Sequence, residues 1–167
     1  MRLTANFDRL CLMLAWASGT IAACVMIVTF VGVTMRYVFR SPLMGGFEMI
    51  EIGMGLMVFT ALPLMIRRRG NISVTLLSDR FPPNLARVTT TLSDLIGAAL
   101  TGFIAWRVWL QGDRLVTYGE VTMELRVPKG LIAQGMATLL AIAALAFLVC
   151  AMEAIRRHRS ANEPGAA

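Results

Sequence analysis

The chain has 167 residues, of which 57% are hydrophobic and only 16% are charged, and its formal net charge is +6. This composition is too apolar for a typical soluble domain. The charged residues form short clusters between apolar runs of about 20 residues, the length that a helix needs to cross about 30 Å of hydrocarbon. A soluble helical bundle would need regularly spaced polar positions, which these runs lack. The pattern therefore predicts an all-α membrane protein with four transmembrane helices.

The basic residues flank the apolar runs and do not alternate with aromatic residues along one face. We therefore expect membrane lipid around the chain and no nucleic-acid partner. The three cysteines are isolated from one another and form no CxxC pair, so we interpret them as packing residues.

The first predicted span covers residues 10–35 and follows a short basic N-terminal stretch. Because the apolar run continues past Cys24, we interpret it as an uncleaved span and not as a signal peptide. Ala15, Gly19 and Ala23 recur at every fourth position, a spacing that permits close contact with another helix.

A charged turn separates the first span from the second, which is predicted at residues 47–66. Arg36 and Arg40 follow the first span, a proline and a Gly-Gly pair predict the turn, and Glu48 and Glu51 open the second span. Helix dipoles favour cations at the end of one helix and anions at the start of the next. We expect Arg36 or Arg40 to pair with one of the glutamates, so that this hairpin acts as a structural clamp.

The remaining spans are predicted at residues 85–110 and 127–152. Residues 71–87 are partly apolar and are compatible with a short interfacial helix between spans 2 and 3. Residues 111–126 are polar and alternate weakly, as in a short extended segment. We expect residues 160–167 to form a disordered tail, and the whole chain to be a single membrane domain.

Four spans place the N-terminus, the second loop and the C-terminus on one side of the membrane. That side carries ten basic residues and the other carries six. The ten are Arg2, Arg9, Arg67, Arg68, Arg69, Arg80, Arg87, Arg156, Arg157 and Arg159, and the six are Arg36, Arg40, Arg107, Arg114, Arg126 and Lys129. The positive-inside rule therefore predicts that both termini are cytoplasmic and that the charged turn faces outward.

The sequence does not suggest an enzyme or a cofactor. The single histidine lies in the C-terminal segment, and no nucleophile or metal cluster accompanies Glu48 and Glu51. Asp94 lies inside the third span, where an ionisable group often marks an ion pathway. A stand-alone proton-coupled transporter that uses Asp94 is therefore the alternative, but the broken helices expected at a midplane site are missing. We prefer a structural role, in which Asp94 pairs with a group on a neighbouring helix.

Several motifs resemble the small membrane subunit, of the DctQ type, of tripartite ATP-independent periplasmic (TRAP) transporters. They read RYVFRSPL at 36–43, FEM at 47–49, RRRGNISV at 67–74, DRFP at 79–82 and MELRVP at 123–128. Arg36 and Glu48 match an arginine and a glutamate of the family pattern. Asn71 departs from it, since histidine is common there.

The resemblance implies a subunit of a secondary transporter for organic acids in the bacterial inner membrane. A periplasmic binding protein would capture the substrate, and a large multi-spanning subunit would carry it with coupling ions, usually Na⁺. This chain would brace the large subunit and help to dock the binding protein. No substrate, metal or cofactor site is then expected in it.

Overall fold

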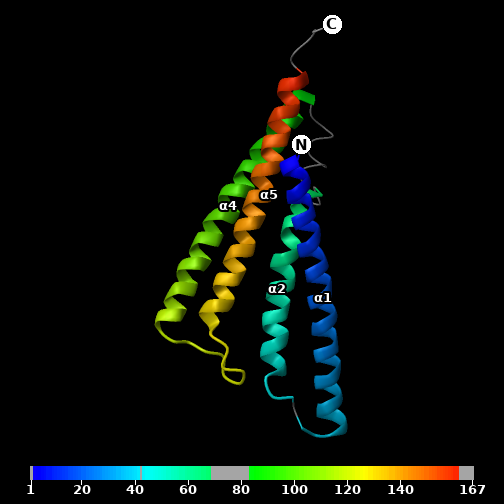
Figure 1. The fold of residues 1–167 in the computed structure, drawn as a ribbon, viewed down its shortest axis with the longest axis vertical. Helices are drawn as coiled ribbons and strands as arrows, with labels where there is room; N and C mark the ends of the chain where they lie inside the picture. The colour runs from blue at the N-terminus through cyan, green and yellow to red at the C-terminus, as the bar shows by residue number, and fades with distance from the viewer. Residues whose placement is uncertain (1, 42, 69–82, 162–167) are drawn as a thin grey trace.

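The computed structural model describes residues 2–41, 43–68 and 83–161, and four α-helices make up most of this part of the chain (Figure 1). They are α1 (Arg2–Val38), α2 (Gly46–Arg67), α4 (Pro83–Thr117) and α5 (Lys129–Ala161). Each helix is longer than its predicted span, because helical backbone continues into the charged segments at its ends. Residues 160 and 161, which we expected in a tail, belong to α5. The predicted interfacial segment lies mostly outside the described residues, and its last part, 83–87, belongs to α4.

Among the residues that the structure describes, three helical segments are long and apolar enough to cross a membrane. The qualifying segments are Asn6–Val38, Gly46–Arg67 and Lys129–Ala154. α4 is not among the segments that qualify within the described residues. The all-helical prediction is confirmed for the described residues, whereas the crossing by α4 stays a prediction.

The helices form two antiparallel hairpins that lie side by side. α1 packs along α2, α4 packs along α5, and α2 contacts α5, which gives the order α1–α2–α5–α4 across the molecule (Figure 1). In the most apolar stretch of α5, 39% of the helix is buried by the rest of the protein, whereas the corresponding share for α1 is 11%. α5 is therefore a central helix, and α1 lies at an edge with much of its surface uncovered.

The start of α1 and the end of α5 lie toward one end of the molecule, and the α1–α2 and α4–α5 turns lie at the other end (Figure 1). We call these the termini end and the turn end. This arrangement agrees with an even number of membrane crossings. Which end faces the cytoplasm stays a prediction from the charge distribution.

Small residues allow the helices to approach one another closely. A Cβ atom at Gly53 would lie 2.5 Å from Val25 of α1, and one at Gly55 would lie 2.5 Å from Met136 of α5. Gly97 of α4 is similarly covered by a Phe147 ring carbon at 2.8 Å. Glycine is therefore a contact residue at all three helix interfaces.

The row of Ala15, Gly19 and Ala23 on α1 does not have a neighbouring helix among the described residues at its central glycine. Gly19 is exposed, and nothing lies within 4 Å of its Cβ position. The contact that this row predicts is therefore not made within the described part of the chain.

Candidate functional site: the clasp between the two turns

The α1–α2 turn ends in a glycine that no other residue can replace without strain. Gly45 precedes α2 and has a φ of 73°, a left-handed conformation that side chains disfavour. A Cβ atom at Gly45 would also lie 2.7 Å from Leu125 in the α4–α5 turn. The backbone conformation therefore favours glycine here, and any larger residue would also have to displace the Leu125 side chain.

The α4–α5 turn is held closed by its own backbone. Val121 and Pro128 form one isolated antiparallel bridge, and the Thr122 N–H donates to the Val127 carbonyl oxygen at 3.0 Å. The Val127 N–H in turn donates to Thr122 Oγ1 at 3.0 Å. The predicted extended segment is thus reduced to this bridge, and the residues between its two sides form a tight turn.

Reciprocal hydrogen bonds join the two turns, and we call this set of contacts the clasp. Glu48 Oε1 accepts the Glu124 N–H at 3.0 Å, and Glu48 Oε2 accepts the Leu125 N–H at 3.0 Å. In return, the Gly45 N–H donates to the Glu124 carboxylate. Hydrogen bonds to an ionised carboxylate are stronger than those between neutral groups. The clasp therefore fixes the first hairpin to the second through a glutamate from each.

The clasp replaces the ion pair that we expected within the first hairpin. Among the described residues, no ion pair joins Arg36 or Arg40 to Glu48 or Glu51. Both arginines are exposed, Arg36 in the last turn of α1 and Arg40 beyond the helix end with a φ of 52°. The reason is that Glu48 points across to the second turn, where two backbone N–H groups already satisfy its oxygens. Glu51 is exposed one turn further along α2.

Sequence reasoning identified Glu48 but missed Glu124. The partners of both carboxylates are backbone N–H groups, which leave no complementary charge in the sequence. The only available signal was the MELRVP motif, which contains Glu124 but says nothing of its contacts.

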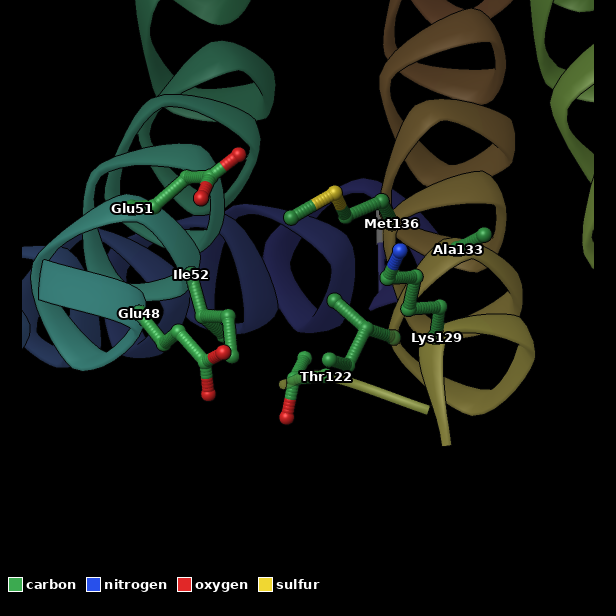
Figure 2. A pocket seen from close by; sticks show the side chains of 8 residues that line it. Glu48, Glu51, Ile52, Thr122, Lys129, Ala133 and Met136 are labelled. Carbon is green, nitrogen blue, oxygen red and sulfur yellow. The ribbon is translucent and has the colours of Figure 1, made fainter. Parts of the chain in front are cut away.

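An open pocket of about 210 Å³ lies beside the clasp, between the first turns of α2 and α5 (Figure 2). Glu48 and Glu51 line it from α2, Lys129 lines it from α5, and Thr122 lines it from the α4–α5 turn. The Lys129 ammonium lies 3.6 Å from Glu120 Oε2. The rest of the lining is apolar and comes from α2 and α5.

A second polar cluster joins three helices toward the termini end, and we call it the Arg67 cluster. Arg67 Nε of α2 lies 2.7 Å from Asp8 Oδ1 of α1, and both terminal nitrogens reach Glu153 of α5, at 3.1 and 3.2 Å. Arg67 Nη1 also lies 3.7 Å from Cys150 Sγ. The Arg67 side chain is only 12% exposed, so most of its contacts with water have been replaced.

Sequence reasoning treated Arg67 only as a charge that sets topology. A signal was present, because Asp8 and Glu153 are single acids among basic residues at the ends of their helices. The sequence could not show that these three ends meet. Cys150 and Cys11 are buried, as expected of packing residues, whereas Cys24 is exposed.

Asp94 belongs to neither the clasp nor the Arg67 cluster. It is partly buried on α4, one turn before Gly97, which packs against α5. Residues three apart share a helix face, so Asp94 lies on the side of α4 that faces α5. Its role stays a prediction.

Nothing in the described ranges resembles a metal centre. No three His, Cys, Asp or Glu residues within these ranges lie in an arrangement that could hold a metal ion. The clasp offers hydrogen bonding and charge from two carboxylates and three backbone N–H groups, and the pocket beside it adds the Lys129 ammonium.

The family model for the DctQ component of tripartite ATP-independent periplasmic transporters matches residues 25–159 of the chain. The chain belongs to this family. The match includes the clasp and all of the Arg67 cluster except Asp8, and it confirms the resemblance seen in the sequence. Among curated proteins, no sequence matches the chain.

The DctQ family provides the small component of TRAP transporters, so the protein is a transport subunit of a membrane complex. This family is not a family of enzymes. The membrane-spanning helices and the transporter family together identify a membrane protein.

Proposed function

We propose that the chain braces the large transport subunit of a TRAP transporter for organic acids. The observation that carries the proposal is that the two hairpins are joined near both ends. The clasp fixes them at the turn end, and the Arg67 cluster joins α1, α2 and α5 toward the termini end. A layer held in two places resists bending and twisting, which suits a fixed support against which another subunit moves.

The uncovered helix faces support the proposal of a membrane partner. Exposed apolar side chains follow both edge helices, with Trp16, Met26 and Phe30 on α1 and Phe103 and Trp106 on α4. Lipid alone would satisfy such faces, but α1 also carries the row of small residues around Gly19, which permits close backbone contact with a partner helix. The proposed partners are the large multi-spanning subunit and the periplasmic binding protein.

We place the protein in the bacterial inner membrane with both termini cytoplasmic. This orientation follows from the ten basic residues on the termini side. The turn end would then face the periplasm, where the clasp and the exposed Arg36 and Arg40 would form part of a docking surface for the binding protein. The substrate and its coupling cations would be bound by the large subunit.

Co-purification and uptake test the proposal together. The chain, expressed with its candidate large subunit and binding protein, should purify as a complex with the large subunit. Proteoliposomes that contain this complex should take up an organic acid when the binding protein is added. Proteoliposomes that contain the chain alone should take up none. Uptake by the chain alone would contradict the proposal and favour the stand-alone proton-coupled transporter with Asp94 as its pathway residue.

A further inference from the structure

The pocket beside the clasp has charges of both signs at its polar side and an apolar floor. Figure 2 shows Glu51 on α2 and Lys129 on α5 on opposite sides of the opening. Ile52, Ala133 and Met136 line the floor between the two helices. This combination suits a ligand with a positive group, a negative group and an apolar part.

The charged groups lie at the depth where lipid headgroups are found. Glu51 is in the second turn of α2, and Lys129 is the first residue of α5, and both helices are apolar enough to span a membrane. The ends of such helices lie in the interfacial region, next to the hydrocarbon. The pocket therefore opens between headgroups on one side and acyl chains on the other.

The two charges still have hydrogen-bonding capacity. Within the described ranges, no group donates a hydrogen bond to the Glu51 carboxylate, whereas the oxygens of Glu48 are used by the clasp. The Lys129 ammonium makes one contact, at 3.6 Å with Glu120, and it has three N–H donors. A carboxylate near hydrocarbon is best satisfied by a cation, and a lysine there by an anion.

We propose that this pocket binds the headgroup of a phospholipid that carries a primary amine. The ammonium of the lipid lies at Glu51, its phosphate lies at Lys129, and an acyl chain follows Ile52 and Met136 into the membrane. The volume of about 210 Å³ is below the range of about 300 to 1,000 Å³ typical of sites for whole drug-sized ligands. It accommodates a headgroup, with the acyl chains outside along the helices. This proposal depends on the membrane position of the chain and not on transport.

Native mass spectrometry of the full chain tests the proposal, with any large subunit that accompanies it retained. The protein is equilibrated in nanodiscs that contain equal amounts of phosphatidylethanolamine, phosphatidylcholine and phosphatidylglycerol. We expect phosphatidylethanolamine to be retained about threefold more than the other two, as an interfacial ion pair permits. Phosphatidylcholine keeps the phosphate but cannot donate from nitrogen, and phosphatidylglycerol has no amine.

Matched variants locate the site. Glu51→Gln should abolish the preference for phosphatidylethanolamine, whereas Asp113→Asn, which changes an exposed carboxylate outside the pocket, should keep it. Ala133→Phe fills the floor without changing a charge and should lower the retention of this lipid. Equal retention of the three lipids by the unaltered protein would overturn the proposal. So would an unchanged preference in Glu51→Gln, or unchanged retention in Ala133→Phe.

Discussion

At the scale of single residues, backbone N–H donors decide which partner the Glu48 carboxylate takes. Arg36 or Arg40 was expected to pair with a glutamate of the same hairpin, but Glu48 accepts two N–H groups from the other hairpin. Neighbouring N–H groups in a tight turn are fixed in place, whereas an exposed arginine must give up side-chain freedom to form a pair. The carboxylate therefore gains more from the turn than from Arg36 or Arg40.

Glu48→Gln should release the α4–α5 turn. The amide side chain keeps the shape but turns one acceptor into an N–H donor, so one of the two N–H groups of the turn loses its partner. Hydrogen exchange at the Glu124 and Leu125 amides should become markedly faster. Glu51→Gln makes the same chemical change one turn away and should leave both amides protected. Equal protection of these amides in Glu48→Gln and the unaltered protein would contradict the clasp.

Arg67→Met should destabilise the protein because it leaves two carboxylates without their shared cation. Removing one partner of a fully buried ion pair typically costs about 3 to 5 kcal/mol. Because the Asp8 side chain is 50% exposed, we expect a smaller loss, about 2 kcal/mol, in unfolding by a denaturing detergent. Arg68→Met alters an exposed neighbour and should change stability little. A loss of the same size in both variants would mean that charge alone, and not the cluster, is responsible.

At the scale of helices, glycine sets how closely the two members of a hairpin approach. Gly130 lies at the start of α5, and a Cβ atom there would be 2.7 Å from the Gly112 carbonyl oxygen and 2.8 Å from the Val116 nitrogen. Both are backbone atoms of α4, so they cannot move aside as a flexible side chain would. α4 and α5 therefore pack nearly backbone to backbone next to the α4–α5 turn.

Gly130→Ala should force the end of α4 and the start of α5 apart. Overpacking of this kind costs about 1 to 3 kcal/mol of stability. Unfolding by a denaturing detergent, as for Arg67→Met, measures this loss. Gly135→Ala is the matched control, because nothing lies within 4 Å of its Cβ position. Since alanine favours helix more than glycine does, this control should be neutral or stabilising by up to about 1 kcal/mol. The interface would be shown to be looser than described if Gly130→Ala were equally harmless.

At the scale of the whole molecule, the four helices form an open layer and not a closed bundle. The order α1–α2–α5–α4 leaves α1 and α4 at opposite edges, each with an uncovered apolar face. In a membrane, lipid can cover such faces at little cost, so the layer does not need to close on itself. An open layer also offers a broad surface to a larger subunit.

Gly19→Leu should weaken the complex without weakening the chain. The Gly19 position is open in this structure, so leucine fits here, but it would hold a partner helix away from α1. We expect less large subunit to co-purify, with an unchanged midpoint of unfolding for the chain alone. Gly135→Leu introduces the same side chain at an open position on α5 and serves as the control. Full recovery of the large subunit with Gly19→Leu would remove α1 from the proposed interface.

The sequence by itself determined the class of the protein. Long apolar runs separated by arginine clusters can be satisfied only by helices in lipid, because hydrocarbon leaves every backbone amide to be paired within its own segment. Motif order and spacing predicted the DctQ family, and the row of Ala15, Gly19 and Ala23 predicted a face of α1 that permits close contact with another helix. These features are local, so they can be identified without knowing which helices meet.

The tertiary structure alone decided which charges meet. Glu48 and Glu124 are far apart in the chain, and so are Asp8, Arg67 and Glu153, and only the side-by-side position of the hairpins brings them together. The clasp in particular depends on backbone N–H groups, which every residue except proline carries and which therefore leave no mark in the sequence. Charge pattern could name Glu48 as a residue of interest, but only the positions of the two turns showed what it holds.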